Sequence, residues 1–178
     1  MLSLTKQTKH LILGGARSGK SSFAENLILS SRFQTAHYVA TAQTLDIEMT
    51  DRIERHKQDR KKVAANFTWQ VIEEPLRLAQ TINELSDDDC ILIDCLTLWV
   101  SNCFHHENWL QEKSLFIQAL QESKATILMV SNEVGHGIVP MDKLSREFVD
   151  ESGWLHQELA QLCDHVSFIT AGLAQTLK

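Results

Sequence analysis

A glycine-rich stretch at residues 14–21, GGARSGKS, holds the side chains best suited to chemistry on a nucleotide. Its spacing is that of a phosphate-binding P-loop, and it follows an apolar run (HLIL) and opens a helix-compatible run, as that motif requires. Glycines let main-chain N–H groups surround phosphate oxygens, the lysine reaches the β- and γ-phosphates, and the serine hydroxyl can ligate Mg²⁺. We therefore expect a nucleotide to bind to Gly14, Gly15, Ala16, Arg17, Ser18, Gly19, Lys20 and Ser21.

Asp94 is the second candidate, because it ends the apolar run CILID at residues 90–94. A carboxylate at the end of a buried strand is typical of a Walker B element, which holds Mg²⁺ directly or through water. The alternative is that Asp94 caps the helix after the strand. With the P-loop present, we expect Ser21 and Asp94 to be the magnesium ligands.

Residues 46–62, DIEMTDRIERHKQDRKK, form a basic helix-compatible segment. It has few residues to bury, so we expect it to protrude, and from Arg52 to Lys62 it contains six Lys or Arg and two Asp or Glu. Arg52, His56 and Arg60 recur every four residues and would share one helix face. A histidine can attack phosphorus and guanidinium groups can hold phosphates. A solvated charged face is the alternative.

The stretch SNEVGHGIVP, residues 131–140, follows the apolar run TILMV. Asn132 and Glu133 are polar groups at the end of an expected strand, and glycines flank His136. Substrate contact and helix capping are both compatible with this pattern.

Six short apolar runs must position these groups: residues 10–13, 36–40, 69–72, 90–94, 126–130 and 165–169. Several are apolar without alternation, and longer helix-compatible segments separate most of them, which is the pattern of a parallel sheet buried on both faces. The pattern predicts a doubly wound α/β fold. With the P-loop, we expect one domain over residues 1–178, of the P-loop NTPase type (RecA-like), with a mostly parallel sheet flanked by helices.

Composition narrows the classes of function. A formal net charge of −6 argues against charge-driven binding to nucleic acid or anionic membranes. No stretch approaches the roughly 20 apolar residues of a membrane span, and the N-terminus lacks the apolar core of a signal peptide. The four cysteines form no Cys-x-x-Cys pair, which favours buried thiols in a reducing compartment. We expect a cytoplasmic protein.

Seven blocks in order carry a resemblance to a known family. They are GGARSGKS, YVATAQ, DIEMTDRIERHKQDR, WQVIEEP, ILIDCLTLWVSN, SNEVGHGIVP and GWLHQELAQLCDHVSFITAGL. Together they resemble, almost end to end, the bifunctional adenosylcobinamide kinase/adenosylcobinamide-phosphate guanylyltransferase family of cobalamin biosynthesis. Residues 148–157, FVDESGWLHQ, depart from the arginine-richer version usual in that family.

The resemblance implies two reactions. ATP or GTP would phosphorylate the hydroxyl of the aminopropanol arm of adenosylcobinamide. His56 would then be guanylylated by GTP and pass GMP to adenosylcobinamide phosphate, which yields adenosylcobinamide-GDP and pyrophosphate. The family assembles as trimers with the active site near a subunit boundary. The residues implied to contact the guanine nucleotide are Thr41, Ala42, Gln43, Lys57, Gln58, Asp59, Arg60, Glu73 and Asp94.

Two other functions fit part of the pattern. A monofunctional P-loop kinase for a small molecule explains the loop and Asp94 equally well, but it does not need His56. A nucleotide-dependent switch would use hydrolysis to change a partner interface. Covalent labelling by GTP separates the first alternative from the bifunctional enzyme, and turnover of a corrinoid excludes a pure switch.

Overall fold

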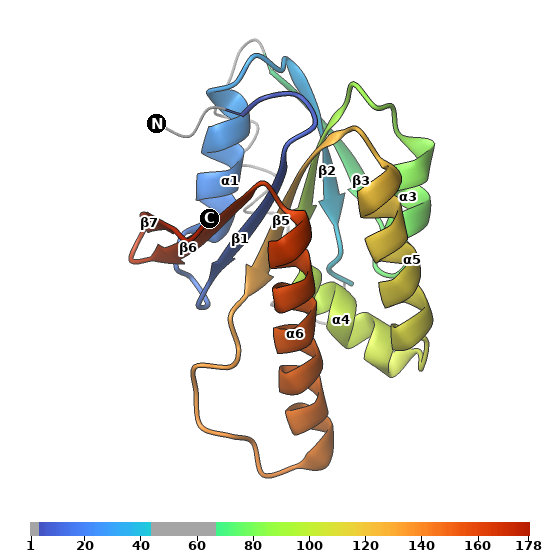
Figure 1. Ribbon diagram of the computed structural model, residues 1–178, viewed down its shortest axis with the longest axis vertical. Helices are drawn as coiled ribbons and strands as arrows, with labels where there is room; N and C mark the ends of the chain where they lie inside the picture. The colour runs from blue at the N-terminus through green and yellow to red at the C-terminus, as the bar shows by residue number, and fades with distance from the viewer. Residues whose placement is uncertain (1–3, 44–66) are drawn as a thin grey trace.

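The computed structural model describes residues 4–43 and 67–178, which form one sheet covered by helices (Figure 1). All six predicted strands are confirmed, and a seventh follows them. The strands are β1 (Lys9–Gly14), β2 (Thr35–Ala40), β3 (Thr68–Glu73), β4 (Cys90–Asp94), β5 (Thr126–Asn132), β6 (His165–Thr170) and β7 (Leu173–Thr176). The helices are α1 (Lys20–Leu29), α3 (Leu78–Glu84), α4 (Leu96–His105), α5 (Trp109–Glu122) and α6 (Lys143–Leu162).

The order of the strands in the sheet is β3-β2-β4-β5-β1-β6-β7. The first six are parallel to their neighbours, whereas β7 pairs with β6 in the antiparallel direction. The carboxyl ends of the parallel strands therefore meet at one edge, which we call the carboxyl edge. Strand β5 lies between β1 and β4, so one strand separates the P-loop from Asp94.

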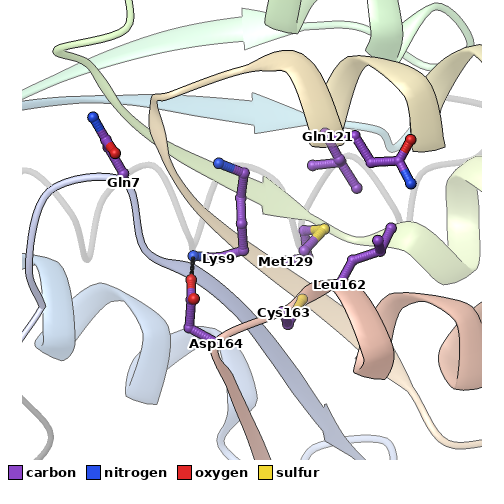
Figure 2. Close-up of a pocket in the computed structure, with 8 residues that line it drawn as sticks. Gln7, Lys9, Gln121, Met129, Leu162, Cys163 and Asp164 are labelled. Carbon is purple, nitrogen blue, oxygen red and sulfur yellow. Dashed lines mark hydrogen bonds between the residues drawn. The ribbon is translucent and has the colours of Figure 1, made fainter.

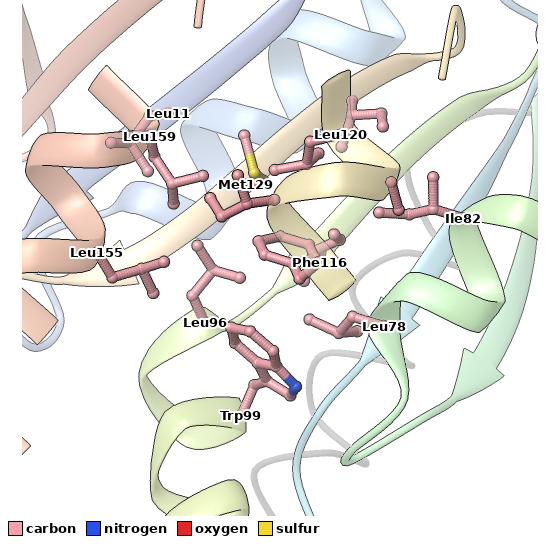
Figure 3. Packing of buried hydrophobic residues seen from close by; sticks show 14 of the residues in the cluster. Leu11, Leu78, Ile82, Leu96, Trp99, Phe116, Leu120, Met129, Leu155 and Leu159 are labelled. Carbon is pink, nitrogen blue, oxygen red and sulfur yellow. The ribbon is translucent and has the colours of Figure 1, made fainter. Parts of the chain in front are cut away.

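The central strands of the sheet are buried on both faces, as the unbroken apolar runs predict. Neighbouring residues of β1 point to opposite faces: Ile12 packs in a cluster with Ile28 of α1, whereas Leu11 packs on the other face. That second face is the larger part of the core and is covered by α3, α4, α5 and α6 (Figure 3). Its largest fully buried side chains include Trp99 and Phe116. Burial of a side chain of this size stabilises the fold by about 1.5–3 kcal/mol.

Helix α6 connects the core to the carboxyl edge. Its buried positions, Ser152, Leu155, His156 and Leu159, recur at helical spacing and face the sheet. Its N-cap is Asp142, whose side chain accepts a hydrogen bond from the Ser145 N–H at 2.8 Å. The loop before α6 and the first half of the helix extend past the carboxyl edge (Figure 1).

The cysteines are free thiols, as expected. Burial raises the pKa of the Cys90 and Cys163 thiols to about 12 and that of Cys95 to about 11. These thiols therefore stay protonated at neutral pH and act as packing groups. Within the described residues, no helix is long and apolar enough to cross a membrane.

Part of the sequence prediction lies outside the described residues 4–43 and 67–178. It concerns the basic segment at 46–62 and, within it, His56, Lys57, Gln58, Asp59 and Arg60. Their roles stay predictions.

Candidate nucleotide site

The P-loop joins the end of β1 to the start of α1 at the carboxyl edge. Gly14 and Gly19 have φ angles of 153° and 100°, a region that side chains with a Cβ rarely adopt. At Gly14 a Cβ would also clash with the main-chain carbonyl of Ile169 and lie 2.8 Å from Ser18 Oγ. The loop can therefore approach β6 closely only because residue 14 is glycine.

Within the loop, the main chain is exposed and the lysine is buried. Gly15, Ala16 and Arg17 face solvent, and the Ser18 N–H donates to the Gly15 carbonyl at 3.3 Å. Lys20 is only 6% exposed, and its ammonium group donates to the same carbonyl at 2.5 Å. The positive charge is therefore held against the loop at the amino end of α1, where the helix dipole also favours an anion.

Asp94 lies at the end of β4, as predicted. The N-cap of α4 is Cys95, so the alternative in which Asp94 caps this helix is wrong. Instead the Asp94 carboxylate accepts a hydrogen bond from the Tyr38 hydroxyl at 2.7 Å. That contact holds one carboxylate oxygen in place at the carboxyl edge.

Thr41 connects the ends of β2 and β4. Its side chain is fully buried, and its hydroxyl donates to the Cys95 carbonyl at 2.7 Å and accepts from the Cys95 N–H at 2.9 Å. The Asn102 amide donates to the carbonyls of Thr41 and Pro75 at 2.9 and 3.0 Å. The Thr41 hydroxyl therefore has a structural task, and its predicted contact with a nucleotide stays a prediction, as do those of Ala42 and Gln43.

Glu73 ends β3 at the same edge and is exposed. Three strands separate β3 from β1. At a spacing of about 4.8 Å between strands, Glu73 is roughly 19 Å from the P-loop strand. If the phosphates of a nucleotide bind to the P-loop, Glu73 can therefore contact only a part of that nucleotide remote from those phosphates.

The end of β5 is next to the P-loop. Asn132 is the register partner of Gly14, and the Glu133 N–H donates to the Gly14 carbonyl at 3.0 Å. Asp142, not Glu133, caps the following helix. The Glu133 carboxylate is 2.7 Å from the Gly135 N–H and 3.6 Å from Nδ1 of His156. The loop continues to His136, which is exposed.

Sequence reasoning missed one neighbour of the P-loop, the turn between β6 and β7. The Gly172 N–H donates to the Ser18 carbonyl at 2.8 Å, and a Cβ added to Gly19 would lie 3.3 Å from Gly172 Cα. The turn therefore supports the loop from the side opposite β5. The Ala-Gly pair at 171–172 was the available signal for a turn.

A hollow of about 280 Å³ lies at the opposite edge of the sheet, beside the start of β1 (Figure 2). Lys9 and Asp164 line it, and the Lys9 N–H donates to the Asp164 carboxylate at 2.7 Å. The Lys9 ammonium group donates to the carbonyls of Ser123 and Ala125 at 2.8 and 3.2 Å. These contacts hold the ends of three elements together on the edge away from the P-loop. We therefore assign the hollow no part in nucleotide binding.

The carboxyl edge thus brings together a phosphate-binding loop, a buried lysine and two carboxylates near strand ends, Asp94 and Glu133.

The fold itself is similar to that of solved structures with little sequence identity. A flagellar accessory protein, FlaH, from Methanocaldococcus jannaschii matches with a TM-score of 0.54 at 13% identity, over 98% of this chain and 80% of that chain. A protein from Pyrococcus horikoshii matches with a TM-score of 0.55 at 11% identity, over 98% and 88%. These likenesses concern the fold alone.

Sequence relatives are much closer. The chain is 45% identical to the bifunctional adenosylcobalamin biosynthesis protein CobP of Pseudomonas aeruginosa, over 96% of this chain and 97% of that protein. It is 34% identical to the bifunctional adenosylcobalamin biosynthesis protein CobU of Escherichia coli, over 94% and 98%. The family model described as cobinamide kinase / cobinamide phosphate guanyltransferase matches residues 10–177. The chain therefore belongs to the cobinamide kinase / cobinamide phosphate guanyltransferase family.

Proposed function

We propose that the carboxyl edge carries out both reactions of the family: phosphorylation of adenosylcobinamide, then transfer of GMP to the phosphate. The observation that carries the proposal is the P-loop with its buried lysine, at the same edge of the sheet as Asp94, which ends β4, and Glu133, which follows β5. The nucleotides are ATP or GTP for the first reaction and GTP for the second.

In the kinase reaction the loop positions the phosphates and offsets their charge. Main-chain N–H groups of residues 15–20 and the amino end of α1 would bind phosphate oxygens, while Lys20 offsets the charge on the transferred group. The hydroxyl of the aminopropanol arm forms a bond to the γ-phosphorus as the bond to the leaving nucleoside diphosphate breaks. Proximity supplies much of the rate enhancement, because this transfer requires little covalent chemistry from the protein.

Ser21 and Asp94 fit a magnesium ion, since hydroxyl and carboxylate oxygens are ligands that Mg²⁺ accepts. The Tyr38 hydroxyl at 2.7 Å holds one carboxylate oxygen of Asp94 in place. When bound, the ion would neutralise phosphate charge.

In the guanylyl transfer we assign the nucleophile to His56. A neutral imidazole nitrogen forms a bond to the α-phosphorus of GTP, and the bond to pyrophosphate breaks. The phosphate oxygen of adenosylcobinamide phosphate then forms the new bond to phosphorus, and the nitrogen–phosphorus bond breaks. Arg52 and Arg60 would hold the phosphates of the group under attack. In the sequence His56 lies in the connection between β2 and β3, whose ends carry Thr41 and Glu73.

We also propose a homotrimer in the cytoplasm, where ATP and GTP are available. The segment at 46–62 has few apolar residues to attach it to its own domain. A neighbouring subunit would supply the missing contacts.

The experiment that tests the function combines the protein, Mg²⁺, adenosylcobinamide and either ATP or GTP, and the corrinoid products are separated by chromatography and identified by mass. We expect adenosylcobinamide phosphate with either nucleotide and adenosylcobinamide-GDP with GTP. If only the phosphate forms, even in excess GTP, the protein is a monofunctional kinase. If neither product forms although the protein binds the nucleotide, the protein is better explained as a nucleotide-dependent switch.

A further inference from the structure

Four polar side chains form a buried chain behind the P-loop edge. Thr97 Oγ1 is 3.2 Å from Ser131 Oγ, which is 2.8 Å from Nε2 of His156. On the other side of the imidazole ring, Nδ1 is 3.6 Å from Oε2 of Glu133. The four residues come from α4, β5, the loop after β5, and α6, so the chain joins three elements at this edge.

Burial excludes the first function that this chemistry suggests. A serine, a histidine and a carboxylate in sequence are typical of a hydrolase triad. Here Ser131 is only 2% exposed and His156 only 6% exposed. A substrate cannot reach the Ser131 hydroxyl, so these side chains do not act as a hydrolase triad on a bound ester. Glu133 is its exposed end, with 18% of its side chain accessible.

The direction of these side-chain hydrogen bonds depends on the tautomer of His156. The Asn132 N–H donates to Thr97 Oγ1 at 2.6 Å. Burial lowers the pKa of His156, although the nearby Glu133 carboxylate opposes the shift, so the ring is neutral at neutral pH. If Nε2 accepts from the Ser131 hydroxyl, Nδ1 carries the ring proton and directs it toward Glu133. The 3.6 Å separation is longer than a hydrogen bond, so this contact is electrostatic.

Glu133, the exposed end of this row of four side chains, lies beside the P-loop. Its N–H donates to the Gly14 carbonyl, so the residue is attached to the first residue of the P-loop. The strand that precedes it, β5, lies between the P-loop strand and the strand of Asp94 (Figure 1). One carboxylate oxygen of Glu133 accepts from the Gly135 N–H, and the other faces His156. The partly exposed carboxylate therefore lies in the loop that follows the strand next to the P-loop.

We propose that Glu133 is the base that accepts the proton of the acceptor hydroxyl in the kinase reaction, and that His156 is the positioning residue that orients its carboxylate. The oxygen–phosphorus bond forms, the bond from the γ-phosphorus to the leaving nucleoside diphosphate breaks, and the hydroxyl proton moves to Glu133. This inference rests on the kinase reaction proposed above. The guanylyl transfer does not need the base, because its acceptor is a phosphate oxygen that is already ionised near neutral pH.

The test measures both reactions with the same preparations of the full-length protein. Glu133→Gln keeps the size of the side chain and removes the base. We expect its kcat for phosphorylation of adenosylcobinamide to fall about 100-fold or more, with KM nearly unchanged. Guanylyl transfer to supplied adenosylcobinamide phosphate should stay at the wild-type rate. The control is Glu147→Gln on α6, an exposed carboxylate 3.3 Å from Lys143, which should leave both rates unchanged.

Two substitutions test the positioning residue. In His156→Asn, the side-chain amide occupies the place of Nδ1 and can still donate toward Glu133. In His156→Gln, the amide instead reaches the place of Nε2, which retains the contact with Ser131 but loses the one with Glu133. We expect the glutamine variant to lower the kinase kcat about tenfold or more and the asparagine variant to retain more of it. If His156 has only a structural role, the glutamine variant should retain more kinase activity than the asparagine variant, or each variant should lower the rates of both reactions equally.

The outcomes separate this inference from the function on which it rests. If the wild-type protein does not phosphorylate adenosylcobinamide, the proposed function and this inference both fail. If it does and Glu133→Gln stays within about threefold of its kcat, only the assignment of the base is wrong. Equal losses of kinase and guanylyl transfer in Glu133→Gln would also overturn the assignment.

Discussion

Acid should destabilise the fold through His10, a histidine in the middle of the sheet. Its ring is buried, Nε2 is 2.9 Å from Ser167 Oγ, and its centre is 5.6 Å from that of the His165 ring. Burial first, and then the charge of His165, lowers the pKa of His10 from 6.5 to about 4. Protonation of this ring is therefore more favourable in the unfolded chain than in the folded protein.

The sign and size follow from proton linkage. Between pH 6.5 and 4 the unfolded state binds more protons at this site, so the stabilisation is complete above 6.5 and is lost as the pH falls toward 4. One pKa unit corresponds to about 1.4 kcal/mol, so the whole shift amounts to about 3 kcal/mol. At pH 4.5 the loss relative to pH 7.5 should be about 2.5 kcal/mol from His10 alone.

Urea denaturation of the wild-type protein and of His10→Gln at pH 7.5 and 4.5 measures this quantity. Glutamine keeps a hydrogen-bonding group near Ser167 but does not titrate. The free energy of unfolding of the wild type should fall between the two pH values by about 2.5 kcal/mol more than that of the variant. Equal losses in the two proteins would refute the reasoning, because they would mean that His10 titrates alike in the folded and unfolded states.

Three further outcomes are expected. Lys20→Ala should abolish phosphorylation of adenosylcobinamide in steady-state assays, since it removes the buried cation of the loop, and near-normal turnover would contradict the role of the motif. Asp94→Asn should leave the melting temperature nearly unchanged and shift the Mg²⁺ dependence of activity to higher concentrations; a large loss of stability with metal-independent activity would argue against a metal ligand. Sedimentation equilibrium at micromolar concentration should give a trimer, whereas a fully active monomer would exclude a site shared between subunits.

Most of the parallel strands could be predicted because they are apolar runs buried on both faces, whereas β3 at the edge of the sheet is largely exposed. Strand β7 carried no such signal: its four residues, Leu173–Thr176, are all exposed, and main-chain pairing with β6 holds it in place. The P-loop could be predicted because glycine spacing and a lysine are local features of the chain. Its support by Gly172 could not, because that contact joins residues far apart in the sequence.

The same distinction applies to the site. Asp94 was predicted from its place at the end of a strand, but the order β4-β5-β1 that places Glu133 next to the loop depends on the topology of the sheet. His156 looked like an ordinary helix residue. Only the packing of α6 against β5 shows that its ring lies between Ser131 and Glu133.

The central claim is that His56 carries GMP between the two substrates. Intact-protein mass spectrometry after incubation with GTP and Mg²⁺ tests it most directly. The account predicts that the wild-type mass rises by one GMP, that the adduct survives alkali and is lost in mild acid, as a phosphoramidate is, and that His56→Asn shows no adduct while it still phosphorylates adenosylcobinamide. An unmodified wild-type protein would contradict the claim in favour of a plain kinase, and an acid-labile adduct on His56→Asn would assign the nucleophile to another residue.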